Sequence, residues 1–517
     1  MMANFKLFNS REAQLPASDA LNHQQAPAYA YQPKHKLAQL AVTGCLNQTF
    51  YADAETQLAE VLKLVAELDA RYVAKAALYA RKKGHMKDMP ALLLAALAAQ
   101  RSSLVPALFE QVVDNGKMLR TFVQILRSGV TGRKSLGSQP KRLVQAWLNS
   151  ASERQLLQAA IGNQPSLADV VKMVHPKPAE AWREAFFAWL IGKPADAEAL
   201  PALTRSLLAF RSGTSSELPD VPFQLLGNET LSATQWAELA GRMGWQALRM
   251  NLNTLLRHGA FAVEGCATAL AQRLADAEVV AKARVYPYQL LAAYRMTGND
   301  VPLVVREALQ DALELSLANV PALSGNVVVC PDVSGSMASP VTGYRQGATT
   351  AVRCIDVAAL VAAAILRKQP RAQVLPFENK VVKVTLNPRD SVMSNAQKLA
   401  AIGGGGTSCS APLKQLADAK AKVDTLILVS DNESWIDARR HGATETLRQW
   451  ERIKQFNPQA RLICIDLQPY GTTQAADRAD ILNVGGFSDA VFDVLAQFAS
   501  GKFGAGHWVD AIEQMEI

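Results

Sequence analysis

Up to about residue 320 the apolar residues recur at helical spacing. Four segments with this period end at Gly or Pro, as helices do: PALLLAALAAQRSSLVPALFEQVV, RLVQAWLNSASERQLLQAAIG, AEAWREAFFAWLIG and TQWAELAGRMGWQALRMNLNTLLRHG. A fifth, TQLAEVLKLVAELDARYVAKAALYARKKG, reads as one long helical stretch. No run here predicts a strand. Successive antiparallel helix pairs that bury their faces against their neighbours indicate an irregular α-solenoid.

After residue 321 the period changes. Short β-branched runs (NVVVCPDVS, AQVLPFENKVVKV, DTLILVSD and ARLICIDLQ) alternate with helical stretches such as AVRCIDVAALVAAAILRKQ and ETLRQWERIKQF. Strand alternating with helix predicts a doubly wound parallel sheet. We therefore expect a loosely ordered segment over residues 1–30, a helical domain over 31–322 and an α/β domain over 323–517, with a turn at Ser324-Gly325 between the last two.

Composition agrees with a multidomain globular protein. The 517 residues are 49% hydrophobic and 19% charged, which suits two to four domains with large cores. The polar start MMANFKLFNS predicts no secretory signal, and the longest apolar runs fall short of the roughly 18 residues that span a bilayer. The six cysteines are scattered without a CxxC pair, as expected of reduced thiols. We expect a cytoplasmic protein with no membrane partner.

The strongest chemical motif, DVSGS at residues 332–336, follows the first predicted strand. Ligands of doubly wound sheets bind at the carboxyl ends of the strands, and two other loops should reach that edge. One carries Thr407 after four glycines, and the other carries Asp431. Two carboxylates and three hydroxyls are hard ligands that suit Mg²⁺ first, with Mn²⁺ or Ca²⁺ as alternatives. The predicted metal ligands are Asp332, Ser334, Ser336, Thr407 and Asp431.

The hypothesis that the same loops form an active site has less support. The chain has no GxSxG nucleophile elbow, and no Lys follows the glycine run as a P-loop requires. A plain structural turn can also produce DxSxS, although here Thr407 and Asp431 arrive at the right strand ends. A metal-dependent hydrolase built on Asp332 and Asp431 lacks a nucleophile–base pair. We therefore expect a protein that is not an enzyme.

The basic excess lies in the N-terminal part. Residues 1–320 hold 34 Lys and Arg against 27 Asp and Glu, whereas residues 321–517 hold 20 against 19. No carboxylate lies between Asp114 and Glu153, a one-sign run that is unusual for a solvated face and typical of phosphate binding. The alternative is a basic surface with no partner. Within the run, residues 131–142 predict a loop. The cations are Lys117, Arg120, Arg127, Arg133, Lys134, Lys141 and Arg142.

Two smaller polar features are ambiguous from the residues alone. His175 lies just before two prolines in VHPKP, which predicts a fixed turn at a helix end and an ordinary loop histidine. The segment RMNLNTLLRHGAF places a polar cluster inside a helical pattern, and capping or packing explains such a cluster as well as ligand binding does. Its polar members are Asn251, Asn253, Arg257 and His258.

Together these segments resemble a known family. TFVQILRSGVTGRKSLGSQPKRLVQAWL, SLADVVKMVHPKP, MGWQALRMNLNTLLRHGAF and RVYPYQLLAAYRMTG are similar to the TROVE domain of the Ro family. DVSGSM with the later Thr and Asp resembles the metal-ion-dependent adhesion site of von Willebrand factor A domains, where a cation grips a partner's carboxylate without bond-breaking chemistry. The order of the two domains matches the Ro family over nearly the whole chain.

The resemblance implies more than the residues show. It implies a ring of HEAT-like helical repeats closed by the A domain, binding small noncoding Y-like RNAs on its outer basic surface and single-stranded 3′ ends of misfolded RNAs in its hole. It also implies association with exoribonucleases such as polynucleotide phosphorylase. Residues 158–163 (QAAIGN) depart from the family, because they lack basic residues. Beside the seven cations, the implied RNA contacts are His175, Lys177, Arg249, Arg257 and His258.

Two hypotheses remain open. The first is a non-catalytic RNA-binding scaffold in RNA quality control, expected to be a monomer. The second is a metal-dependent protein-interaction adaptor, in which the A domain grips an acidic partner and RNA is irrelevant. The carboxylate-free run favours the first. Loss of metal ligands should leave RNA binding nearly intact under the first and abolish function under the second.

Overall fold

The computed structural model describes residues 15–43, 46–227, 229–283, 285, 287–320, 322–344, 352–436, 442–486, 489–501 and 506–517. The chain divides into two compact units: residues up to 61 with 268–514, and residues 62–267 with 515–517. The divisions fall inside α2 (Ala54–Glu67) and α15 (Cys266–Leu274). The last helices before the α/β domain therefore pack with that domain, a grouping that sequence periodicity does not reveal. The predicted domain boundaries remain a prediction.

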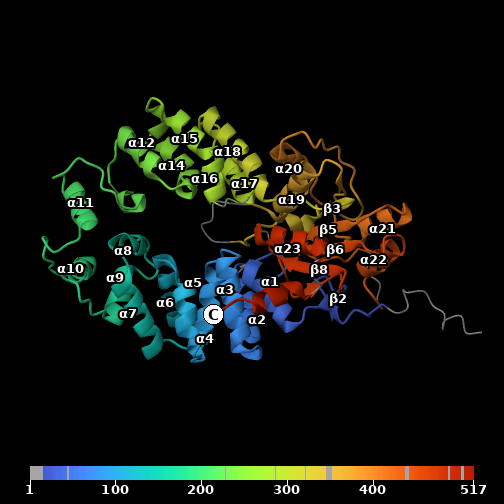
Figure 1. Ribbon diagram of the computed structural model, residues 1–517, viewed down its shortest axis with the longest axis horizontal. Coiled ribbons are helices and arrows are strands. Elements are labelled where there is room, and N and C mark those ends of the chain that lie inside the picture. Colours follow the sequence, from blue (N-terminus) through green and yellow to red (C-terminus); the bar gives the residue numbers. More distant parts are fainter. Residues whose placement is uncertain are drawn as a thin grey trace, which may run out of the picture. The chain divides into compact units, whose positions relative to one another are not determined.

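Residues 62–267 are built from helices throughout the described part, as the period predicted. The helices pack mainly against others one to three positions away along the chain, for example α3 on α4 and α5, and α6 on α8 and α9, which is the local contact pattern of a solenoid (Figure 1). No described helix is long and apolar enough to cross a membrane. The helices are α3 (Ala70–Lys82), α4 (Asp88–Ala99), α5 (Val105–Val112), α6 (Gly116–Ser128), α7 (Ser138–Ser150), α8 (Glu153–Ala159), α9 (Leu167–Val174), α10 (Ala181–Leu190), α11 (Ala202–Arg211), η3 (Phe223–Leu226), α12 (Ala233–Arg242), α13 (Trp245–Met250), α14 (Leu252–Arg257) and η4 (Ala260–Ala262).

Local capping residues set the ends of these helices. The stretch expected to be one long helix is broken into α2 and α3, because the Asp69 carboxylate accepts from the backbone N–H groups of Arg71 (2.9 Å) and Tyr72 (3.2 Å). Capping boxes begin α8 at Ser152 and α9 at Ser166. The loop expected over residues 131–142 is shorter than predicted, because α7 already begins at Ser138.

The other unit holds a five-stranded parallel sheet in the order β4-β3-β5-β6-β8, as predicted for the α/β domain. In its register Val329 pairs with Ile427, Ile427 with Ile463, and Ile463 with Leu482. The strands are β3 (Val327–Pro331), β4 (Gln373–Val374), β5 (Thr425–Ser430), β6 (Arg461–Asp466) and β8 (Ile481–Gly485). The helices are α1 (Pro33–Thr43), α16 (Ala277–Ala283), α17 (Pro287–Met296), α18 (Leu303–Ser316), η5 (Leu317–Asn319), η6 (Gly335–Ala338), α19 (Cys354–Lys368), α20 (Val392–Ala400), α21 (Ser410–Asp418), α22 (Glu445–Phe456), α23 (Asp489–Ala499) and α24 (His507–Glu513).

Both faces of the sheet are buried, which explains why the strands read as continuous apolar runs. Alternate residues such as Val328, Leu426 and Leu462 join one core cluster with α21 and α22. Helix α19 contacts β3 and β5. The run AQVLPFENKVVKV forms a shorter strand than expected, because beyond β4 it pairs only through isolated bridges at Phe377 and Val381. Strand β8 was not predicted, because its sequence ILNVG includes Asn and Gly, which are depleted in strands.

The N-terminal segment is more ordered than the sequence suggested. Residues 1–14 lie outside the described residues, but β1 (Ala20–Leu21) and β2 (Pro27–Ala30) form an antiparallel sheet with β7 (Thr472–Thr473). The Tyr29 side chain is buried in the core of the α/β domain, and its hydroxyl donates to the Pro16 carbonyl at 2.8 Å. The expectation of a loosely ordered segment is wrong for residues 15–30, because their strand partner lies about 440 residues away.

A buried ion cluster joins α17 to α19 within the same unit. The Asp356 side chain is fully buried and accepts from Arg353 Nη2 at 2.8 Å, while Arg295 Nη1 lies 2.5 Å from its Oδ2. Burial alone would raise the pKa of Asp356, but the hydrogen bonds from the two guanidinium groups lower it below its usual value. The last helices of the TROVE-like segment are therefore fixed to the α/β domain by a charge pair as well as by packing.

Candidate functional site

The five predicted metal ligands lie on three loops at one edge of the sheet. Asp332, Ser334 and Ser336 follow β3, and Asp431 follows β5, so these residues leave the carboxyl ends of neighbouring parallel strands. Thr407 is on the glycine loop between α20 and α21. All five side chains are buried, with exposures of 0 to 6%. A solvated turn would leave such polar side chains exposed.

Hydrogen bonds hold the first loop in shape. Ser334 N–H donates to Asp332 Oδ1 at 2.8 Å, and Ser430 Oγ donates to Asp332 Oδ2 at 2.6 Å. The Ser334 and Ser336 hydroxyl oxygens lie 3.3 Å apart. The DxSxS spacing therefore directs both serine hydroxyls and one carboxylate into a single small volume.

The glycine loop packs directly on the DxSxS loop. Gly335 N–H donates to the Gly405 carbonyl at 3.1 Å, and Gly404 N–H donates to the Val333 carbonyl at 3.1 Å. Gly405 has a φ of +75°, and a Cβ there would overlap the Glu378 carboxylate. Only glycine allows this approach, which carries Thr407 to the same edge of the sheet.

The electrostatics of this edge favour a cation. Burial raises the pKa of Asp332, and burial together with the charge of Asp332 raises the pKa of Asp431. Asp466, at the end of β6, is also buried, its pKa is raised, and its Oδ1 has no hydrogen-bond partner among the described atoms. Several acidic groups held in a buried, mutually repulsive arrangement would be stabilised by a divalent cation.

The donor set fits a hard cation that relies on hydroxyl ligands. Within the described residues no three His, Cys, Asp or Glu side chains converge as a metal cluster. Two carboxylates and three hydroxyls remain, which is the oxygen-rich set that Mg²⁺ accepts. The sequence prediction missed Asp466 and Glu433; the signal for Asp466 was its position at the end of the predicted strand ARLICIDLQ.

The N-terminal segment lies against the loop that follows Asp431, a contact the sequence did not predict. Asn22 is 3% exposed, and its Nδ2 donates to the Ser434 carbonyl at 2.8 Å. His23 N–H donates to Glu433 Oε2 at 2.9 Å, and its ring Nδ1 lies 3.2 Å from Oε1 of the same carboxylate. This bond raises the pKa of His23, although burial opposes the shift.

Two tyrosine rings surround the contact between His23 and Glu433. The His23 ring stacks on Tyr51 with centroids 5.7 Å apart and meets Tyr470 edge-on at 5.0 Å. Burial raises the pKa of Tyr51, and the side chain of Ser336, one of the predicted ligands, acts in the opposite direction. Residues from the N-terminal segment therefore form part of the wall around the candidate metal centre.

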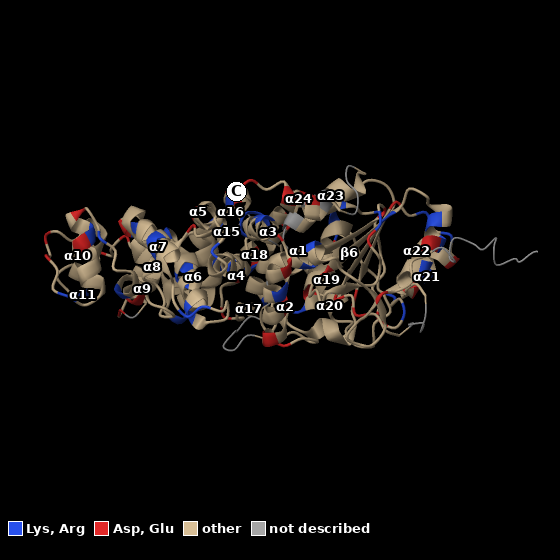
Figure 2. Cartoon of the chain, turned by 90° about the horizontal axis from the view of Figure 1, so that it is seen from below, with Lys and Arg blue, Asp and Glu red and all other residues tan. Residues whose placement is uncertain are grey.

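The second candidate site is the carboxylate-free segment. Helices α6 and α7 carry Lys and Arg and no Asp or Glu, as Figure 2 shows. Four of the predicted cations are exposed, and among the described residues none of the four forms an ion pair with a carboxylate. Lys141 is half-buried in the first turn of α7. The four exposed cations are Lys117, Arg127, Lys134 and Arg142.

Two of the predicted cations have structural roles instead. Arg120 is 9% exposed, and its guanidinium donates to the carbonyls of Pro165 (3.1 Å) and Ile161, so it is not available to a ligand. The RNA contact of Arg120 stays a prediction that its buried position does not favour. Arg133 is half-buried and donates to the Ala98 carbonyl at 3.2 Å.

The remaining predicted contacts differ in exposure. His175 is exposed in the left-handed conformation (φ 51°) and caps α9, as the two following prolines predicted, and Lys177 is exposed nearby. Arg257 is exposed at the end of α14. The exposed His258 ring stacks on Trp236 at 4.3 Å. Arg249 is half-buried and donates to Gln246 Oε1 at 3.0 Å, which limits its reach.

Known protein families match both the helical part and the α/β part of the chain. The family model of the Ro60 vWA domain matches residues 326–499, and the TROVE domain model matches residues 217–312. The chain is 28% identical to the RNA-binding protein RO60 of Deinococcus radiodurans, over 92% of this chain and 94% of that protein. It is 24% identical to the RNA-binding protein RO60 of Caenorhabditis elegans, over 45% of this chain and 36% of that protein.

The fold is also that of a solved structure. The crystal structure of the Deinococcus radiodurans RO (RSR) protein superposes with a TM-score of 0.62 at 23% identity, covering 91% of this chain and all of that one. Fold and domain content thus define a helical-repeat protein with a TROVE domain and a C-terminal von Willebrand factor A domain. The chain therefore contains the two domains that the Ro60 vWA and TROVE models describe, and it is similar to Ro proteins over nearly its whole length.

Proposed function

We propose that this protein is a non-catalytic RNA-binding protein of the Ro type. The observation that carries the proposal is the carboxylate-free segment, where Lys117, Arg127, Lys134 and Arg142 are exposed and form no ion pair with any carboxylate that the structure describes. Cations without a carboxylate partner bind phosphates without first breaking an ion pair, and each contact releases counterions from the RNA. Relatives named as RNA-binding proteins support the same role.

The RNAs that we propose are of two kinds. One is a small, structured, Y-like noncoding RNA held on the basic surface, with His175 and Lys177 beside it. The other is a misfolded or defective RNA with a single-stranded 3′ end, passed to an exoribonuclease such as polynucleotide phosphorylase during RNA quality control. We further propose that the protein acts in the cytoplasm as a monomer.

The metal centre would serve a separate role. Asp332, Ser334, Ser336, Thr407 and Asp431 would hold one divalent cation, most simply Mg²⁺. The cation, when bound, supplies an open coordination position for a partner's carboxylate. Ser430 fixes the orientation of Asp332 through its 2.6 Å hydrogen bond, and the N-terminal segment shields the outer side of the loop after Asp431.

A binding experiment tests the RNA proposal. Fluorescence anisotropy would compare a labelled RNA hairpin bearing a single-stranded tail with an acidic polypeptide of equal negative charge. An RNA-binding protein should prefer the hairpin at every salt concentration. Equal or tighter binding of the polypeptide would contradict the proposal, because it would mean that the cations recognise negative charge alone.

The second candidate function, a metal-dependent protein-interaction adaptor, is favoured by the exposed apolar side chains beside the metal centre. Trp435 and Ile436 are each 41% exposed, and their N–H groups donate to the Thr407 carbonyl. The Asp431→Ala variant separates the two functions. The RNA-binding proposal expects this variant to bind RNA as the native protein does, whereas the adaptor would lose its main activity.

A further inference from the structure

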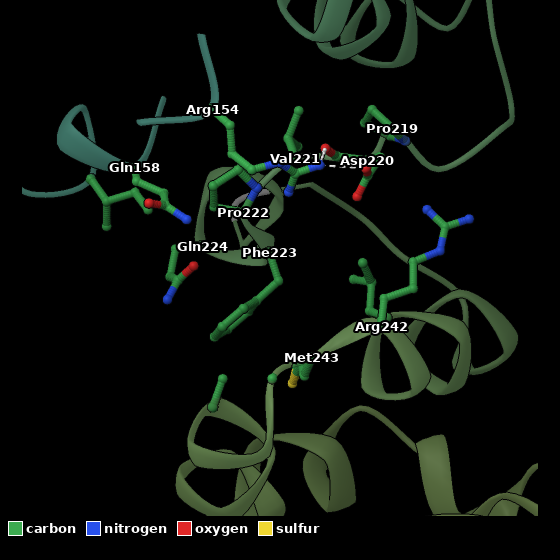
Figure 3. Close-up of a pocket in the computed structure, with 14 residues that line it drawn as sticks. Arg154, Gln158, Pro219, Asp220, Val221, Pro222, Phe223, Gln224, Arg242 and Met243 are labelled. Atoms are coloured by element: carbon green, nitrogen blue, oxygen red, sulfur yellow. Dashed lines mark hydrogen bonds and ion pairs between the residues drawn. The ribbon is translucent and has the colours of Figure 1, made fainter. Parts of the chain in front are cut away.

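A cavity of about 340 Å³ opens among α8, η3 and the α12–α13 turn, and α8 follows directly after the carboxylate-free segment in the sequence. Figure 3 shows Phe223 projecting from η3 into this space, with Gln158 and Gln224 on the same side of the cavity. The volume lies near the lower end of the roughly 300–1,000 Å³ of small-ligand sites. It suits a ligand of the size of a nucleoside.

The charges at the cavity are already balanced. Arg154 forms an ion pair with Asp220 and donates to the Asp220 carbonyl at 3.0 Å. Arg242 pairs with Glu238 and donates to the Leu218 carbonyl at 3.0 Å. Because both guanidinium groups have carboxylate partners, the cavity offers no free cation for an isolated phosphate.

The cavity offers instead the half-buried ring of Phe223 and two side-chain amides. Within the described residues the side chains of Gln158 and Gln224 make no hydrogen bond, and both are exposed. Each amide offers a donor and an acceptor, and Gln pairs with the edge of a base in this way. Single-stranded RNA is recognised by the same combination, an aromatic ring for stacking and polar side chains for the exposed base edge.

We propose that this cavity receives one unstacked nucleobase of a single-stranded RNA segment, with Phe223 against the base and Gln158 and Gln224 at its edge. The inference rests on the proposed RNA-binding function and adds to it a site that is selective for bases. The basic segment would hold phosphates, and this neutral cavity would distinguish an unpaired strand from a paired one, because a paired base cannot enter.

The test uses the full-length protein and labelled twelve-nucleotide oligouridylate and oligoadenylate. The Phe223→Leu variant keeps an apolar side chain and removes the aromatic face. Base stacking of this kind contributes enough that affinity should fall about fivefold or more. The slope of affinity against salt should not change, because no phosphate contact is lost. The matched control is Phe210→Leu, a half-buried aromatic of α11 outside the cavity.

Two further arms complete the test. RNA carrying 4-thiouridine should crosslink to the peptide that contains Phe223, and Gln158→Ala with Gln224→Ala should change the preference between the two oligonucleotides. Native affinity in Phe223→Leu, with no crosslink to residues 219–224, would overturn the inference while leaving the RNA-binding function intact. Equal melting curves of Phe223→Leu and the native protein would show that the variant folds.

Titrations with free uridine and adenosine monophosphates distinguish a site for a base of an RNA strand from a site for a free nucleotide. If neither oligonucleotide binds the native protein, the proposed RNA-binding function fails. If a monophosphate then binds saturably, and Phe223→Leu abolishes that binding, the cavity is a site for free nucleotides and the inference that it receives a base of an RNA strand is overturned. If oligonucleotides bind through Phe223 and monophosphates bind only weakly, the inference is supported. If neither the oligonucleotides nor the monophosphates bind at the cavity, the inference is contradicted.

Discussion

Neutralising the exposed cations of the carboxylate-free segment should change how RNA affinity depends on salt. The variant replaces four exposed residues by Gln: Lys117, Arg127, Lys134 and Arg142. On single-stranded RNA each lost phosphate contact removes about 0.7 from the slope of log affinity against log salt, so four contacts remove about 2.8. Between about 50 and about 200 mM salt the native protein should therefore lose about 50-fold more affinity than the variant. Arg120 is left unchanged, because it holds the Ile161 and Pro165 carbonyls.

Anisotropy titrations of a tailed RNA across the salt series measure both slopes. The control carries the same change of four charges on exposed cations of the α/β domain, at Lys383, Arg389, Lys420 and Lys422. If long-range charge alone controlled binding, both variants would lose slope equally. An unchanged slope in the α6–α7 variant would refute the assignment of these cations to phosphates.

Further predictions concern stability and metal. Asp356→Asn should lower the free energy of unfolding by about 3–5 kcal/mol at pH 7, because it breaks a buried ion cluster. The native fold lowers the pKa of Asp356, so the stability that the ionised carboxylate contributes is present above pH 3.8 and is lost as the pH falls further. The difference in unfolding free energy between the variant and the native protein should therefore shrink in acid. A difference that stays constant with pH in urea melts would contradict this. Asn22→Ala should expose residues 15–32 to protease, because Asn22 bonds the Ser434 carbonyl and the backbone of its own turn; native resistance would argue against it. Asp431→Asn should abolish stabilisation by Mg²⁺, about 2.7 kcal/mol at 100 times Kd, while making the metal-free protein more stable in chelator, because one of two repelling buried charges is removed. Thermal melts measure both effects, and a metal response equal to that of the native protein would exclude Asp431 as a ligand.

The parts of the fold that depend on local pattern could be predicted from sequence. The helical period predicted the helices, and the β-branched runs predicted β3, β5 and β6. The DxSxS motif was informative because its position after a strand determines where its side chains lie. β8 and the pairing of β2 with β7 were missed, since a strand of a few residues carries little pattern and its partner is chosen by the tertiary fold.

The role of a charged residue was harder to predict than its location. Arg120 and Lys117 belong to the same helix and the same basic run, yet Arg120 is buried against carbonyls more than 40 residues away while Lys117 is exposed. Helical spacing places them three positions apart, and only the packing of α6 on α8 decides which one faces inward. The contact of Asn22 with the metal-site loop likewise depends on residues about 410 positions apart.

We propose that this protein selects RNA with an unpaired 3′ end. The most direct test is the affinity of the native protein for a structured RNA with a free single-stranded 3′ tail, against the same RNA with its tail paired, across a salt series with Mg²⁺ and with chelator. We expect salt-dependent binding that prefers the free tail and survives chelation. Weak binding without a tail preference would contradict it, and binding lost in chelator would indicate the metal-dependent adaptor instead.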